Sequence, residues 1–359
     1  MASDQLPDYG RHLAVSITNA CPLQCGHCIS NSSPKSRQGF QGLAENFAGF
    51  LDLWPKARHV TLTGGEPFYD LAGMKLFLEL CVQREVRAGA ITSGYWAKTP
   101  KAAAEMLNKV PRLHSLTISS DVFHQQYVSV DFIANAYRAG RERGLLTHVR
   151  LTRHAETKDD ERELRAKILD FCDPEDLEDA LLAPYGRAEE FREELARSTP
   201  REAKLGLCPS SGPHIFESGR VTPCCNSIVS LEQEHALDFG NILGEPSSAV
   251  KARLLSDEFF LTIKILGFDF LRDYLDEIGE LDFAPVSACE FCFQLCKEPR
   301  QFRKLESLFK NPEFRFQLHA IAIGEYGNHF SGAPIKSLVA KHVTASEMAP
   351  ELEQATTPA

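Results

Sequence analysis

Residues 11–188 alternate short strands with amphipathic helices, and this alternation restricts the chain to few folds. The expected strands lie at 12–18, 59–63, 87–93, 114–120, 146–152 and 180–184. The expected helices, marked by apolar residues at three- and four-residue spacing, lie at 41–53, 71–83, 100–109, 130–143 and 158–171. Strands that alternate with helices of this length predict an α/β fold with a parallel sheet.

The two faces of each expected strand differ in chemistry. In the first strand, aliphatic Leu13 and Val15 alternate with small Ala14 and Ser16, and later strands repeat the pattern. An open sheet covered by helices on both faces would be apolar on both. The pattern instead suits a barrel with helices outside and a lined cavity inside, although six units fall short of the eight of a closed (β/α)8 barrel.

Three cysteines, Cys21, Cys25 and Cys28, follow the first expected strand at C-x3-C-x2-C spacing. Soft thiolate ligands on one short loop select zinc, Cu(I) or an iron–sulfur cluster. A structural zinc site is closed by four ligands, whereas three thiolates on a [4Fe–4S] cube leave one iron free for another molecule. A zinc loop that borrows His27 as its fourth ligand is the alternative at this stage.

A second motif ends the second expected strand with Gly64, Gly65, Glu66 and Pro67. The glycines allow the backbone to approach a ligand closely, and the proline fixes φ where the chain turns into the next helix. Together the two motifs resemble the radical S-adenosylmethionine (radical SAM) enzymes. The resemblance implies a partial (β/α)6 barrel, a [4Fe–4S] cluster on the three cysteines, and SAM as cofactor. It also implies that Glu66 accepts a hydrogen bond from the methionine ammonium.

Further SAM contacts are expected at the ends of later strands, where active-site groups of such barrels gather. By resemblance, Ser93 and either Ser119 or Asp121 would meet the ribose or methionine of SAM, and Arg150 would pair with its carboxylate. Residues 184–188 look like the adenine-proximal end of the sixth strand. Asp121 and His124 are candidate catalytic groups over the barrel mouth. The alternative is that Asp121 only caps a helix.

Six further cysteines lie within a short second region; they are Cys208, Cys224, Cys225, Cys289, Cys292 and Cys296. A hairpin with a turn at Ser218–Gly219 is expected between the first two. The pattern resembles a SPASM/Twitch extension, which carries auxiliary iron–sulfur clusters, but a full pattern has seven cysteines. One auxiliary [4Fe–4S] cluster is therefore expected, and it needs four ligands. The obvious set is Cys208, Cys224, Cys289 and Cys292, with the last two on a C-x2-C turn. Cys225 or Cys296 could substitute for one of them or ligate a second centre, and a structural zinc site is the alternative.

The expected domain organisation is a barrel at 1–195, a small cysteine-rich α+β domain at 196–300, a helical extension at 301–342 and a disordered tail at 343–359. Cys81 and Cys172 stand alone in apolar contexts and are expected to be buried small hydrophobes. The net charge of −10 argues against a broad nucleic-acid face. No apolar run is long enough for a membrane span and no signal peptide is evident, so a cytoplasmic protein is expected.

The expected activity is reductive cleavage of SAM to a 5′-deoxyadenosyl radical that removes hydrogen from a substrate C–H bond. The favoured substrate is a peptide that is oxidised or cross-linked. A small molecule such as an amino sugar or alcohol is the first alternative, and a non-catalytic zinc-binding scaffold is the second. A reductant such as flavodoxin or ferredoxin is an expected partner. Residues 1–11 are too short for a fused leader-peptide recognition module, so such a module is expected on a separate chain.

Overall fold

The computed structural model describes residues 9–36, 42–154, 156–198 and 204–326. The predicted tail at 343–359 and the end of the predicted helical extension, 327–342, lie outside these residues. Among the described residues, no helix is both long enough and apolar enough to cross a membrane.

Six parallel strands form an open sheet that confirms the predicted α/β architecture and repeat. They are β1 (His12–Thr18), β2 (His59–Gly64), β3 (Arg87–Thr92), β4 (Ser115–Ser120), β5 (Leu146–Arg153) and β6 (Leu177–Leu181). The first five match their predicted ranges within one residue at each end. The prediction for the sixth was wrong by three residues at both ends, because charged Glu178 and Asp179 interrupt the apolar pattern of this edge strand.

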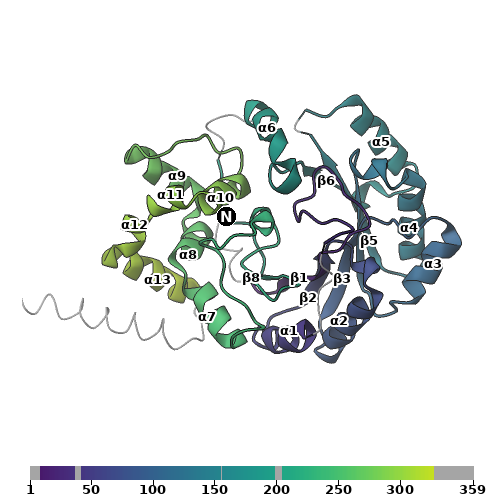
Figure 1. Ribbon diagram of the computed structural model, residues 1–359, viewed down its shortest axis with the longest axis horizontal. Coiled ribbons are helices and arrows are strands. Elements are labelled where there is room, and N and C mark those ends of the chain that lie inside the picture. The colour runs from purple at the N-terminus through teal and green to yellow at the C-terminus, as the bar shows by residue number, and fades with distance from the viewer. Residues whose placement is uncertain (1–8, 37–41, 155, 199–203, 327–359) are drawn as a thin grey trace, which may run out of the picture.

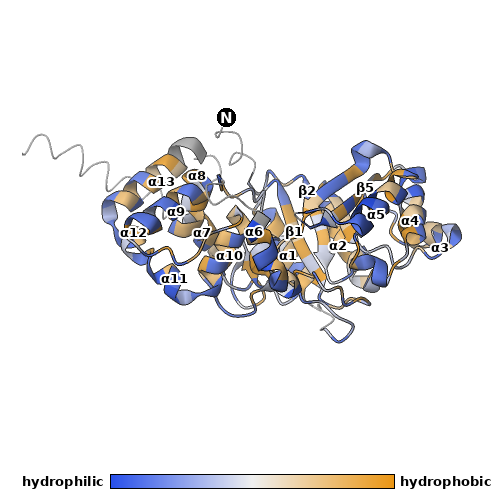
Figure 2. Ribbon diagram, turned by 90° about the horizontal axis from the view of Figure 1, so that it is seen from above, coloured by the Kyte–Doolittle hydropathy of each residue, from blue (hydrophilic) through white to orange (hydrophobic). Residues whose placement is uncertain are grey.

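Helices cover the outer face of the sheet, as predicted for a partial (β/α)6 barrel (Figure 1). They are α1 (Leu43–Asp52), α2 (Leu71–Gln83), α3 (Pro100–Asn108), α4 (Val130–Glu142) and α5 (Asp159–Leu169). Leu13, Val15, Val60 and Leu62 are fully buried in the core beneath them, and Figure 2 shows the apolar strands between the helices. On the inner face, Thr61 and other polar residues remain half-buried. Cys81 and Cys172 are buried, as predicted.

The predicted hairpin consists of β7 (His214–Ile215) and β8 (Val221–Thr222), joined by a turn in which Gly219 has φ +85°. The sequence did not predict its position. Strand β7 pairs in parallel with β1, with Ala14 opposite His214, so one sheet runs β6-β5-β4-β3-β2-β1-β7-β8 across the predicted domain boundary. The Nε2 atom of His214 lies 2.8 Å from Ser16 Oγ and adds a side-chain bond to this junction.

The remainder of the second region is helical. Helix α6 (Arg192–Ser198) follows the barrel, and the second region has α7 (Ser247–Ser256), α8 (Glu258–Ile265), α9 (Gly267–Glu277), α10 (Ala288–Lys297), α11 (Pro299–Arg303), α12 (Glu306–Lys310) and α13 (Pro312–Tyr326). Helices α7 to α13 gather on one side of the molecule, opposite α2 to α5 (Figure 1). The two parts are joined by partly buried polar contacts. The guanidinium of Arg192 donates to buried Glu290 on α10 at 2.7 Å, and Lys251 on α7 donates to the Leu53 carbonyl at 2.7 Å.

Candidate metal centres

The loop with Cys21, Cys25 and Cys28 leaves the C-terminal end of β1, at the end of the sheet where a (β/α) barrel places its active site. The Cys21 N–H donates to the Ser33 carbonyl at 3.1 Å and closes the loop, and the Cys28 N–H donates to the Cys25 carbonyl at 3.3 Å. Burial raises the pKa of the Cys21 thiol to about 12, and the negative charges of Glu66, Cys28 and Cys25 add to this effect. The charges of Cys25 and Cys28 thus act on Cys21, and a bound cation would hold the Cys21 thiol as a thiolate.

Gly64 and Gly65 bring the end of β2 against the start of this loop. The Gly65 N–H donates to the Thr18 carbonyl at 2.8 Å, and the Glu66 N–H donates to the Ala20 carbonyl at 3.0 Å. A Cβ on Gly65 would lie 2.2 Å from the Ala20 oxygen, and Gly64 has φ +123°. The close approach that these glycines permit is thus between two segments of the chain itself, in addition to any approach to SAM.

Glu66 is 1% exposed and accepts four hydrogen bonds. Its Oε1 accepts from the Phe68 N–H at 3.2 Å and the Thr92 hydroxyl at 2.7 Å. Its Oε2 accepts from the Ser93 N–H at 2.8 Å and the Ser93 hydroxyl at 2.7 Å. Burial raises the pKa of Glu66, and these hydrogen bonds oppose that shift. Two predicted SAM contacts, Glu66 and Ser93, therefore lie together, and Pro67 begins the short helical turn after them.

Asp121 is buried after β4 and binds both the backbone and two imidazoles. Its Oδ1 accepts from the N–H groups of Phe123 and His124 at 3.0 and 2.9 Å, so it binds the backbone of the turn that follows β4. Its Oδ2 lies 2.8 Å from His124 Nδ1 and 3.1 Å from His27 Nε2. Burial acts to lower the pKa of His124, but the negative charges of Asp121 and Cys25 raise it well above its ordinary value. The catalytic role of Asp121 and His124 stays a prediction, and their contacts place both beside the cysteine loop.

Arg187 is a site residue that the sequence did not single out beyond its place in 184–188. Its Nε donates to the Cys25 carbonyl at 2.7 Å and its Nη2 to the Ser32 carbonyl at 2.9 Å. Its own N–H donates to the Cys28 carbonyl at 3.1 Å. Arg187 therefore clamps the cysteine loop from the segment after β6. Adenine contact by this segment stays a prediction.

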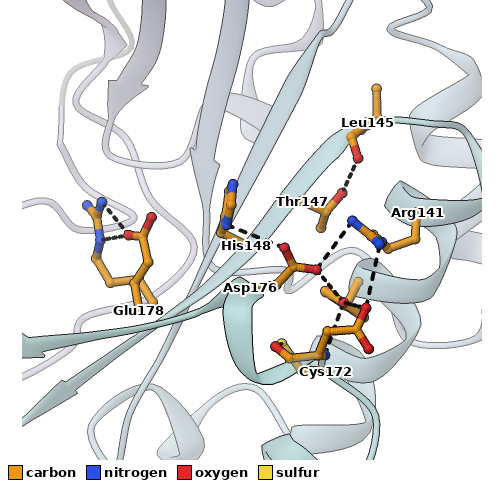
Figure 3. A network of polar contacts seen from close by, with 10 residues as sticks. Arg141, Leu145, Thr147, His148, Cys172, Asp176 and Glu178 are labelled. Carbon is orange, nitrogen blue, oxygen red and sulfur yellow. Dashed lines mark hydrogen bonds and ion pairs between the residues drawn. The ribbon is translucent and has the colours of Figure 1, made fainter.

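Ser119 and Arg150 lie opposite each other on β4 and β5 and face the inner side of the sheet. Arg150, 43% exposed, donates through Nε and Nη2 to Glu178 Oε2 on β6, at 3.0 and 2.8 Å (Figure 3). Nearby Asp176 accepts a hydrogen bond from Tyr137 at 2.6 Å, within a polar network between α4 and β6. Arg150 thus already has a carboxylate partner, and pairing with SAM would require an exchange of that partner.

A second group of thiols surrounds the end of the β7–β8 hairpin. The prediction that Cys289 and Cys292 lie on a turn was wrong: both lie on α10, where positions 289, 292 and 296 share one face. Burial raises the pKa of Cys224, and the charges of Cys208 and Cys292 add to it. Burial raises the pKa of Cys289 to about 12, with contributions from Cys292 and Cys208. The hydrogen bond between Cys292 and Cys296 completes the group, whereas Cys225 is exposed.

Comparison with known proteins places the first cysteine loop in a family. Residues 15–168, which contain both sequence motifs, match the family model described as "Radical SAM superfamily". These residues form a radical SAM domain. Such a domain implies a [4Fe–4S] cluster and SAM, and the site fits them, because the loop with its three soft donors lies beside the glycine turn and Glu66.

One curated relative of this radical SAM protein is the "Putative peptide biosynthesis protein YydG" of Bacillus subtilis (strain 168). It is 22% identical over 313 residues, which cover 80% of this chain and 92% of YydG. Among solved structures, Streptococcus suis SuiB bound to precursor peptide SuiA has TM-score 0.48 and 16% identity, over 72% of this chain and 67% of SuiB. Native anSMEcpe with bound AdoMet and Kp18Cys peptide has TM-score 0.47 and 13% identity, over 82% of this chain and 99% of its own.

Proposed function

We propose that this radical SAM protein is an enzyme that modifies a peptide, most simply by oxidation or cross-linking. The observation that carries the enzyme assignment is the convergence of Cys21, Cys25 and Cys28 beside the Glu66–Ser93 pair. The peptide assignment is supported by YydG, whose name refers to peptide biosynthesis and whose match extends over 80% of this chain. The half-buried polar inner face of the sheet offers surface for an extended substrate.

The chemistry that a bound cluster and SAM supply is reductive cleavage of the sulfonium, which yields a radical able to remove hydrogen from a C–H bond. The chain's own residues position and shield these groups. Gly65 and Arg187 fix the cysteine loop against the ends of β2 and β6. Glu66 and Ser93 are proposed to meet the methionine part of SAM, and Ser119 and Arg150 its ribose and carboxylate. Asp121 and His124 hold the loop from beneath and are proposed to serve proton transfer.

The second group of thiols is proposed to hold one auxiliary [4Fe–4S] cluster of the SPASM/Twitch kind. Four ligands are available from Cys208, Cys224, Cys289 and Cys292. Cys296 could replace Cys292, because the two thiols are hydrogen-bonded. Such a centre has all four irons ligated, so it would serve electron transfer and not SAM cleavage.

The test uses the full-length protein, reconstituted anaerobically with iron and sulfide. We expect a brown protein that forms 5′-deoxyadenosine from SAM under reductant. Peptides encoded by short reading frames beside its gene should change mass in the same reaction. A colourless protein that holds stoichiometric zinc and leaves SAM intact would contradict the enzyme assignment. Turnover of a small alcohol or amino sugar, with no peptide changed, would contradict the peptide assignment alone.

A further inference from the structure

A lysine is buried in the middle of the second cysteine region. Lys264 on α8 is 1% exposed, and its Nζ donates to the carbonyls of Cys208 at 2.9 Å and Ser210 at 2.7 Å. Both acceptors are neutral. Among the described residues, no carboxylate forms an ion pair with this ammonium. A buried charge without a counter-charge is costly by several kcal/mol, so the site is expected to contain an anion.

The segments that carry Cys208 and Cys224 meet around this lysine. The Ser210 hydroxyl donates to the Pro223 carbonyl at 2.5 Å, and the Tyr9 hydroxyl donates to the same carbonyl at 3.1 Å. The Lys264 Nζ lies 5.5 Å from the centre of the Tyr9 ring. Burial lowers the pKa of Lys264, and the negative charges that oppose this shift are those of Cys208 and Cys224. Cys208 and Cys224, both ligands of the proposed cluster, would therefore supply the counter-charge once a bound cluster holds them as thiolates.

We propose that Lys264 is the internal counter-charge of the auxiliary centre and raises its reduction potential. The inference rests on the proposed auxiliary cluster. A [4Fe–4S] cube with four thiolates carries two net negative charges when oxidised and three when reduced. A fixed positive charge in a poorly screened interior stabilises the more negative state more strongly, so the lysine favours reduction. Lys264 acts here as a positioning and tuning residue, because it ligates no iron.

The potential of the auxiliary centre can be measured alone in the full-length chain with Cys21→Ala, Cys25→Ala and Cys28→Ala, reconstituted with iron and sulfide. In this background, Lys264→Met should lower the equilibrium constant for reduction at least tenfold, which is about 59 mV for a one-electron couple. Electron paramagnetic resonance during a potentiometric titration gives this value. Lys264→Arg keeps the charge and should stay near the parent potential. Ser210→Ala removes a neutral hydrogen bond of the same junction and should not shift it.

An unchanged potential in an iron-loaded Lys264→Met protein would overturn the inference, as would an equal shift in Ser210→Ala. If the background protein binds zinc or no metal at this site, the auxiliary cluster itself is refuted and the inference falls with it. That result is recognised by iron analysis before any lysine variant is compared.

A second measurement separates charge compensation from a purely structural role. Without metal, Lys264→Met should unfold at a higher temperature than its parent, because an uncompensated buried charge is gone. With the cluster loaded, the same variant should unfold at a lower temperature than its parent. Destabilisation in both states would overturn the proposal. If Lys264→Met does not accumulate, Lys264→Gln, which keeps a donor for the Cys208 carbonyl, is measured in its place with the same expectations.

Discussion

At the scale of single residues, Glu66 links the turn after β2 to the end of β3. All four of its described hydrogen-bond donors come from the turn after β2 and from the end of β3, and the side chain is 1% exposed. A neutral side chain in place of this buried carboxylate would leave some of these donors without an acceptor. The identity of Glu66 therefore bears on stability and, in its proposed role, on SAM binding, and the two effects need separate measurements.

Glu66→Gln should lower the free energy of unfolding by about 1–3 kcal/mol, because an amide nitrogen would face donors that now meet oxygen. SAM affinity should fall roughly ten- to hundred-fold, from loss of one charge-assisted bond. Chemical denaturation and equilibrium binding of SAM to the loaded protein measure the two effects. Glu79 is an exposed residue of α2, and Glu79→Gln is the control that should change neither value. SAM affinity equal to the parent would mean that Glu66 serves the fold alone.

Arg187 illustrates what sequence patterns leave out at this scale. Arg187 makes three contacts to the cysteine loop. Its two side-chain bonds join residues that are 162 and 155 positions apart in the chain. Nothing in local periodicity marks such a residue. The predicted role of Arg150 shows the same limitation. Its partner Glu178 belongs to an edge strand that begins and ends three residues before the predicted bounds.

Arg187→Lys should release cluster iron to a chelator roughly tenfold faster or more, since a lysine cannot reach both carbonyls and one such bond contributes about 1.5–3 kcal/mol. The rate is followed by the absorbance of the iron–chelator complex. Arg84→Lys is the matched control, because Arg84 also makes a forked contact, to Asp52, away from the loop. Equal release rates in the two variants would contradict a clamping role for Arg187.

At the scale of elements, strands and helices were largely predictable and their junctions were not. Alternation within strands and three- to four-residue spacing within helices located ten of the eleven predicted elements of the barrel within about two residues. The C-x2-C segment gave an ambiguous signal, because two cysteines three positions apart converge on a turn and on a helix alike. Only the packing of α10 against the helical turn at Ser227–Ser230 and against its neighbouring helices decides between these, and a local pattern does not contain that packing.

The junction of β2 with the cysteine loop depends on Gly65. Gly65→Ala should lower both the iron bound per chain and the thermal unfolding midpoint. The added Cβ would lie 2.2 Å from the Ala20 carbonyl oxygen and must push the loop away. Iron per chain and the thermal unfolding midpoint measure this. Gly49 is an exposed position of α1 where an added Cβ would meet nothing within 4 Å. Gly49→Ala should therefore stabilise the helix by up to about 1 kcal/mol. Full iron in Gly65→Ala would show that the loop tolerates the displacement.

At the scale of the whole molecule, the barrel and the cysteine-rich region share a sheet and two partly buried polar contacts. A defect in one proposed metal centre therefore need not unfold the other, because the shared sheet does not depend on metal ligands. The sequence indicated two groups of cysteines, and their separate roles stay predictions. It could not show that β7 continues the barrel sheet, since a two-residue strand carries almost no periodicity.

Removing Cys289 and Cys292 together should reduce iron from about eight to about four per chain, at four irons per cluster. Formation of 5′-deoxyadenosine should continue, while conversion of the peptide stops. Cys225→Ala is the control for cysteine removal and should keep about eight irons, because this exposed thiol is not one of the four proposed ligands. If the intact protein never binds more than four irons, the second centre is not an iron–sulfur cluster.

The pairing of β7 with β1 also bears on how the protein is made. Ser16 and His214, bonded across this junction, are 198 positions apart in the chain. During synthesis, the edge of β1 emerges from the ribosome long before its partner and stays unpaired while the rest of the barrel is translated. Such an edge can template wrong strand pairing. The nascent barrel is therefore expected to need shielding by chaperones until the hairpin arrives.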